Sequence, residues 1–195
     1  MKDQSVREHI LETSKKVFQQ LGYEKVTMDD VAKASGKGRS TLYYYFKNKG
    51  DVFEAVVSDE YYKMISKAKA AVNKSNSINE NLLHYTEVKL KILIELATTY
   101  DRILIDIKKN EAILSKIHLN VRNEDIVLIE ECLLWAIEKE EITPVSTSDI
   151  EFLALAIVTA TSSIEREIFL YETIKNDMLK RLQWITQLII KGLQH

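Results

Sequence analysis

The chain of 195 residues is long enough for one sizeable domain, or for a small domain joined to a larger one. Hydrophobic residues make up 46% of it, which excludes a disordered chain, and the net charge is −2. With one Pro and five Gly, long helices are favoured over a strand-rich fold, which needs more turn residues.

The charge is unevenly distributed along the chain. Residues 1–50 hold ten Lys and Arg against six Asp and Glu, which leaves 17 and 23 for residues 51–195. A basic N-terminal part on an acidic body is typical of a protein that contacts a polyanion at one end only.

Three features bear on the cellular compartment. The N-terminus lacks the apolar stretch of a signal peptide, and the longest uninterrupted apolar run, Phe152–Val158, is too short to span a bilayer. The one cysteine, Cys132, lies in an apolar run, where a small buried side chain is favoured over a redox role. We therefore expect a cytoplasmic protein without a membrane association.

The first two helices are predicted from an apolar face and two end signals. The face predicts a helix over about 5–21, and Gly22 ends it because glycine adopts the left-handed conformation at little cost. Thr27 opens the second helix, and Asp30 three residues later completes a capping-box pattern.

A glycine-rich turn separates this second helix from a third. Gly36 and Gly38 break the chain, and a helix over about 39–46 follows that buries Leu42 and Phe46. Two short helices around a tight turn form a helix-turn-helix, the unit that inserts its second helix into the major groove of DNA.

The remaining pattern is helical throughout, so the predicted fold is all-α. Asn48 caps a long helix over 49–73, which links a helix-turn-helix domain (1–50) to a larger helical domain (51–195). Polar breaks fall at 74–79 and 143–148, and Ser146 to Ser148 offer caps for the helix that follows. The further predicted helices cover 80–98, 100–109, 111–118, 122–140, 147–171 and 174–193.

The third helix carries the side chains expected to meet DNA. Ser40 and Thr41 have hydroxyls for base edges or phosphates, and three consecutive tyrosines follow. Successive residues on a helix turn by about 100°, so at least one tyrosine is exposed. For Tyr43, a mostly buried ring and a phosphate contact remain equally open.

These residues resemble the DNA-binding domain of the TetR family of transcriptional regulators over about residues 5–55. The resemblance is carried by Leu21-Gly22-Tyr23, by Thr27–Ala34 and by Ser40–Lys49. It implies phosphate contacts from Thr27, Tyr43 and Lys49. It also implies positions at or near base edges for Arg39, Ser40, Thr41, Tyr44 and Tyr45.

The turn departs from the family pattern at two positions. Lys37 stands where an apolar residue is usual, and Gly38 stands where a serine often caps the recognition helix. We expect a more basic turn in which Lys37 adds a phosphate contact.

In this family the C-terminal region is a helical domain that dimerises and often holds a small molecule. The resemblance therefore implies a homodimer that binds a palindromic operator in double-stranded DNA, together with a small-molecule effector. The two C-terminal helices are the candidate dimer contact, and the predicted residues are Leu153, Ile157, Thr161, Trp184 and Leu188.

A mixture of aromatic and polar side chains suggests an effector pocket, although any single one of them is more simply an ordinary core or interface residue. The candidates are Tyr85, Lys89, Tyr100, Ile103, Ile107, Trp135, Thr159, Ser162, Ser163, Arg166 and Phe169. Arg166 is either an anchor for an acidic ligand or a surface ion pair with its neighbours Glu165 and Glu167.

No catalytic constellation, metal-ligand spacing or cofactor motif is found in the sequence, so we do not expect an enzyme, a metal or a cofactor. The favoured function is a DNA-binding transcriptional regulator, a repressor that an effector releases from its operator. The alternative is a DNA-bound interaction protein that positions a partner without sensing a ligand.

Overall fold

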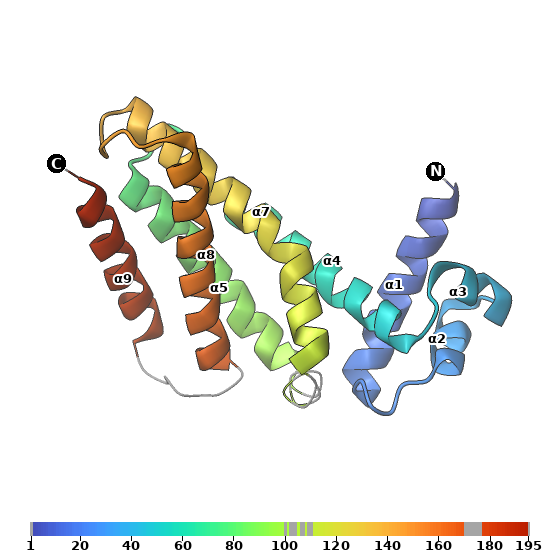
Figure 1. Cartoon of the computed structure of the whole chain (residues 1–195). Helices are drawn as coiled ribbons and strands as arrows, with labels where there is room; N and C mark the ends of the chain where they lie inside the picture. Colours follow the sequence, from blue (N-terminus) through green and yellow to red (C-terminus); the bar gives the residue numbers. More distant parts are fainter. Residues whose placement is uncertain are drawn as a thin grey trace. The chain divides into compact units, whose positions relative to one another are not determined.

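The computed structural model describes residues 2–99, 101, 105, 108, 111–169 and 177–194. Within these residues the chain forms eight helices and no strand (Figure 1), so the predicted all-α fold is confirmed. The chain divides into a first unit, residues 1–62 with 96–120, and a second unit, residues 63–95 with 121–195.

The first unit contains α1 (Lys2–Leu21), α2 (Met28–Ser35), α3 (Arg39–Tyr45) and the first part of α4 (Lys49–Ala70). Its core contains Ile10, Phe18, Val31, Leu42, Phe46 and Phe53, all buried. The rings of Phe18 and Phe53 meet edge to face with their centroids 5.1 Å apart, which joins α1 to α4. This core holds α1, α2 and α3 together as one body.

The second unit contains α8 (Thr147–Phe169), α9 (Met178–Leu193) and most of α5 (Ile78–Thr99) and α7 (Glu111–Glu138). Buried side chains from all four helices form its core, among them Leu82, Leu128, Leu133, Ala154, Leu182 and Ile190. The stretch Thr147–Glu167 in α8 is long and apolar enough to cross a membrane by length and composition, as core helices of other proteins also are.

Local end signals are where the sequence predicts them. Gly22 has φ 78° and its N–H donates to the Phe18 carbonyl at 2.9 Å, which ends α1. The Asn48 Oδ1 accepts from the Asp51 N–H at 3.0 Å at the start of α4. The Ser146 hydroxyl accepts from the Asp149 N–H at 3.2 Å at the start of α8.

Three predicted boundaries are wrong. The helices predicted over 111–118 and 122–140 form one helix, α7, because no Gly or Pro interrupts the segment. α1 begins at Lys2 rather than near residue 5. α4 ends at Ala70 rather than at residue 73, because the Asn73 side chain accepts from the Ser75 N–H at 2.9 Å and forms a turn.

The predicted helix over 100–109 lies largely outside the described residues, as do the facing ends of the helices predicted over 147–171 and 174–193.

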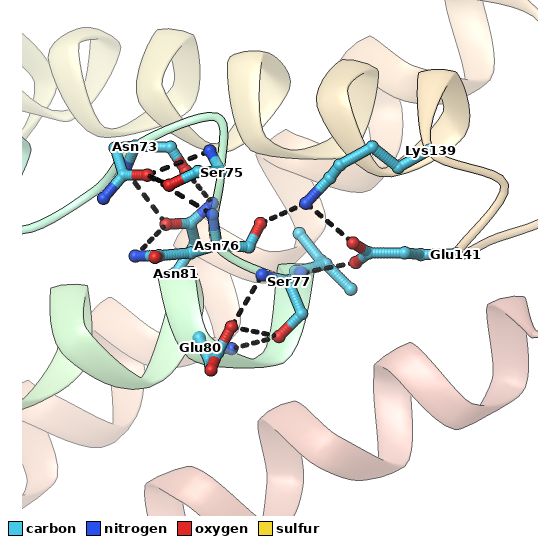
Figure 2. A network of polar contacts seen from close by, with 9 residues as sticks. Asn73, Ser75, Asn76, Ser77, Glu80, Asn81, Lys139 and Glu141 are labelled. Atoms are coloured by element: carbon cyan, nitrogen blue, oxygen red, sulfur yellow. Dashed lines mark hydrogen bonds and ion pairs between the residues drawn. The ribbon is translucent and has the colours of Figure 1, made fainter.

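A polar network joins the α4–α5 connection to the end of α7 (Figure 2). The Glu141 Oε2 accepts from the Ile78 N–H at 2.6 Å, and Glu141 also pairs with Lys139 at 2.8 Å. Lys139 in turn donates to the Asn76 carbonyl. Within the connection, the Asn81 Oδ1 accepts from the Asn73 N–H at 3.0 Å. The start of α5 is thereby tied to the end of a helix that lies about 60 residues further along the chain.

Candidate functional site

The beginning of α2 is fixed by a reciprocal cap. The Thr27 Oγ1 accepts from the Asp30 N–H at 3.2 Å, and the Asp30 carboxylate accepts from the Thr27 N–H at 2.9 Å. The predicted capping box is therefore confirmed. The hydrogen bonds from Thr27 also lower the pKa of Asp30, because they stabilise its charged form. Thr27 itself is exposed, so its predicted phosphate contact is geometrically open.

The turn between α2 and α3 uses its two glycines differently. Gly36 has φ 62°, a left-handed conformation in which a side chain is strained, and the Lys37 N–H donates to the Ala32 carbonyl at 3.1 Å. Gly38 has φ −66° and ψ 153°, which any residue adopts, and a Cβ there would meet only the Ser40 Oγ, at 4.0 Å. The backbone therefore requires glycine at 36 but not at 38.

The third helix buries one side and exposes the other. Leu42 and Phe46 are buried in the first unit, as predicted. Tyr44 is 75% exposed and Tyr43 is 50% exposed, so Tyr43 is not a core residue in this structure. Arg39 and Ser40 are exposed and Thr41 is half-buried. The exposed side chains carry guanidinium and hydroxyl groups, the kinds of group that contact base edges and phosphates in protein–DNA complexes.

Two of the predicted DNA contacts have acidic partners that the sequence pattern did not reveal. Arg39 on α3 forms an ion pair with Asp29 on α2. The Tyr45 hydroxyl donates to Asp3 near the start of α1, and this hydrogen bond is the main reason why the pKa of Tyr45 rises to about 12. Tyr45 is therefore half-buried and directed toward α1, unlike the neighbouring Tyr44.

The side chain of Lys49, the first residue of α4, contacts the loop between α1 and α2. Its Nζ donates to the carbonyl oxygens of Tyr23 and Glu24, each at 3.0 Å, and lies 4.7 Å from the centroid of the Tyr23 ring. The lysine thus joins the start of α4 to the loop that precedes Thr27. Its predicted phosphate contact remains a prediction.

The second unit encloses a small cavity between four helices. Its volume is about 10 Å³, enough for roughly one water molecule. The lining residues are Leu82, Tyr85, Thr86, Ile129, Ile157, Val158, Thr161, Glu165, Leu182 and Thr186. Of the residues predicted to line an effector pocket, Tyr85 is in this set.

A buried charge cluster lies beside the cavity. The Lys89 Nζ is 3.0 Å from the Asp125 Oδ2 and 3.2 Å from the Glu165 Oε2, and the Tyr85 hydroxyl donates to Asp125. The Lys89 side chain is 2% exposed and that of Asp125 is fully buried. Burial raises the pKa of Glu165, the Lys89 ammonium opposes this shift, and the Asp125 charge adds to it.

The other predicted pocket residues have mixed surroundings. Ser162 is buried, Trp135 is half-buried and Thr159 is exposed. Arg166 donates to the Ser163 hydroxyl at 3.2 Å, while Glu165 contacts Lys89. Tyr100, Ile103 and Ile107 lie outside the described residues, as does the side chain of Phe169.

The predicted dimer residues divide into two groups. Ile157 and Thr161 line the cavity of their own chain, and Leu153 is half-buried. Trp184 is 61% exposed and Leu188 is 48% exposed. Sequence reasoning missed Phe152, which is 68% exposed although it lies in the most apolar run of the chain. The spacing could have revealed it, because Phe152 and Leu155 are three residues apart and so are neighbours on the surface of the helix.

Comparisons with known proteins agree with this geometry. Residues 10–56 match the model of the bacterial regulatory proteins of the tetR family. An HTH-type transcriptional regulator of Bacillus subtilis, YhgD, is 40% identical over 73 residues, which is 37% of this chain and 38% of that protein. The matches span between 25% and 51% of the length of the curated relatives.

Two solved structures share the whole fold. A TetR-family transcriptional regulator from Syntrophomonas wolfei has a TM-score of 0.70 at 17% identity, over 97% of each chain. SmeT of Stenotrophomonas maltophilia has a TM-score of 0.63 at 15% identity, over 95% of this chain and 89% of that one. The N-terminal helices of the chain therefore match the tetR family of bacterial regulatory proteins, and the chain shares its all-helical fold with TetR-family structures.

Proposed function

We propose that the protein is a homodimeric, sequence-specific DNA-binding regulator that represses transcription from a palindromic operator until a small molecule releases it. The observation that carries this proposal is that α3 has one buried apolar side and one exposed polar side. One side of this helix is anchored in the core by Leu42 and Phe46, and the other presents Arg39, Ser40, Tyr43 and Tyr44. A rigidly held helix with an exposed polar surface is what recognition of the major groove requires.

The pairing of Arg39 with Asp29 supports a role in reading bases rather than only in charge attraction. The carboxylate holds the guanidinium in one place on the exposed surface, so less side-chain freedom is lost when it meets a guanine edge. The net positive charge of residues 1–50 supplies the less specific attraction to phosphates.

The dimer is supported by an apolar surface on α8 and α9. Phe152, Leu155, Trp184 and Leu188 are exposed on these two helices, which pack against each other. Large apolar side chains left exposed on neighbouring helices are candidates for an interaction site. We propose that the partner protomer binds there. To read successive major grooves, the two DNA-binding domains of such a dimer have to bind half-sites about 34–36 Å apart.

Effector release is supported by the cavity in the second unit and by the fold neighbours. SmeT is the repressor of a multidrug efflux pump, and a further similar structure is its complex with triclosan. The dimer would bind its operator more weakly if an effector favoured a conformation in which the two helix-turn-helix domains do not fit adjacent major grooves. Since transcriptional regulation takes place at DNA, we expect the protein in the cytoplasm, acting without catalysis.

The volume of the cavity is the observation that favours the alternative function. A space of about 10 Å³ admits no organic effector unless side chains move. A DNA-bound protein that positions a partner would need no larger cavity. Saturable binding of a small molecule in this unit excludes that alternative.

In vitro selection of DNA bound by the purified full-length chain tests the proposal. We expect enrichment of a short palindrome, with Arg39→Ala changing or relaxing the preferred bases. Lys180→Ala is the control, because Lys180 is an exposed cation on α9 in the second unit. Selection without sequence enrichment, or a pattern that Arg39→Ala leaves unaltered, would refute the assignment of α3.

A further inference from the structure

The hydroxyl groups that line the cavity of the second unit already donate their protons to other groups of the protein. The Thr86 hydroxyl donates to the Leu82 carbonyl at 2.7 Å, that of Thr161 to the Ile157 carbonyl at 2.8 Å, and that of Thr186 to the Leu182 carbonyl at 2.9 Å. The Tyr85 hydroxyl donates to Asp125. These side-chain donors are therefore engaged elsewhere.

What the lining residues still offer to a ligand is acceptor capacity. Hydroxyl oxygens retain lone pairs after donating their proton, and the Glu165 carboxylate accepts hydrogen bonds. Among the ten described lining residues, Glu165 carries the only charge. The remaining surface is apolar, with Leu82, Ile129, Ile157, Val158 and Leu182 contributing side chains from all four helices.

The charged residues beside the cavity also favour a positively charged ligand. Glu165 and Asp125 both contact the Lys89 ammonium, so the negative charge of Glu165 is shared with a second carboxylate in a buried region. A cation placed against Glu165 would compensate that charge, whereas an anion would add a third negative charge beside two others. Burial of a carboxylate is favourable only when it is paired and hydrogen-bonded.

We propose that this cavity opens to take an apolar organic cation, with its ammonium group held by the Glu165 carboxylate and its hydrocarbon part against Leu82, Ile157 and Leu182. The inference rests on the proposed function, because it names the chemical class of the effector. The threonine oxygens of α5, α8 and α9 accept the remaining ammonium protons. Because the closed cavity holds about one water, the ligand binds a more open arrangement of these helices, and this difference couples binding to conformation.

Three probes with the same hydrocarbon chain test the class directly. Octylammonium, octanoate and octanol are titrated into the full-length wild-type protein by calorimetry, below the concentrations at which they aggregate. We expect saturable binding of octylammonium at one site per chain, and at least tenfold weaker binding of octanoate. Octanoate that binds as tightly as octylammonium, or no saturable binding of octylammonium, overturns the proposal. This comparison needs no variant and so does not depend on the folding of one.

Glu165→Gln tests the residue. We expect the affinity for octylammonium to fall at least tenfold and that for octanol to change less than twofold, because only the first ligand uses the charge. Glu124→Gln is the matched control, because Glu124 is exposed on α7 and should leave both affinities unchanged. An unchanged octylammonium affinity in Glu165→Gln refutes the role of this carboxylate.

The two proposals fail separately. Loss of octylammonium binding in a protein that still selects a palindrome refutes the ligand class and leaves the regulator intact. Octylammonium binding in a protein that selects no DNA sequence supports the ligand class and refutes the proposed regulator.

Discussion

Replacing Lys89 by methionine should strongly destabilise the second unit. Methionine has a similar length, so packing is largely kept while the ammonium is removed. At an effective dielectric constant near 20, contacts of 3.0 and 3.2 Å each correspond to about 5 kcal/mol of attraction, most of which desolvation of the lysine cancels. The variant, however, leaves the fully buried Asp125 and the largely buried Glu165 without this cation. Breaking a buried pair in this way typically costs about 3–5 kcal/mol.

The assay is urea denaturation of wild type and variant at one protein concentration, because a dimer makes the midpoint depend on concentration. A loss of about 4 kcal/mol reduces the equilibrium constant for folding roughly a thousandfold. With a slope near 2 kcal/mol per molar urea, the midpoint moves by about 2 M. The triple variant Lys89→Met, Asp125→Asn, Glu165→Gln should regain much of this loss, because it removes the two carboxylate charges together with the ammonium.

The exposed pair Lys74–Glu138 supplies the control. Its side chains are 59% and 56% exposed, so water already solvates them, and Lys74→Met should cost less than about 1 kcal/mol. If Lys89→Met also costs less than about 1 kcal/mol, the cluster is not desolvated as the structure indicates. The reasoning on the cavity would then lose its electrostatic basis.

Four further outcomes are expected. Lys37→Ala should make the salt dependence of operator binding shallower by about 0.9 in log–log slope for each phosphate that the lysine no longer neutralises, and Lys180→Ala should not; equal slopes in wild type and Lys37→Ala would count against the proposed phosphate contact. Thr27→Ala should lower the free energy of unfolding by about 1 kcal/mol in urea titrations, with serine at this position restoring it, because only the cap is removed. Burial raises the pKa of Glu165, so the folded protein binds that proton more tightly than the unfolded chain does. The stability of wild type relative to Glu165→Gln should therefore fall as the pH rises from the ordinary carboxyl range through the raised pKa and then level off; a difference that grows with pH has the wrong sign. Burial also raises the pKa of Cys132 to about 12, so a thiol reagent at pH 8 should modify it only after denaturation, and rapid modification of the native protein would contradict its burial.

Features set by neighbouring residues could be predicted from the sequence. The caps at Thr27, Asn48 and Ser146 each involve a partner three residues away, and the end of α1 depends on one glycine. A spacing of three is visible in the sequence, and its physical meaning does not depend on the rest of the fold. The same is true of the buried apolar residues Leu42 and Phe46, which lie four positions apart, about one helical turn.

Features set by distant residues could not be predicted. Lys89 is a predicted pocket residue, but its partner Asp125 is 36 positions away and Glu165 is on a third helix. Tyr45 likewise meets Asp3 across 42 positions. An apolar period shows that a helix face is covered but not what covers it, which is why the sequence predicts a dimer contact for Ile157 although this residue lines its own chain's cavity.

The polar network between the α4–α5 connection and the end of α7 should make the loop open only when the end of the helix opens. Backbone amides in surface loops normally exchange their hydrogens with water quickly, because nothing has to unfold first. Here the amides of Asn73 and Ile78 are held by the side chains of Asn81 and Glu141 (Figure 2). Their exchange should therefore be as slow as that of the last turn of α7, and both segments should open in one cooperative step rather than fray independently.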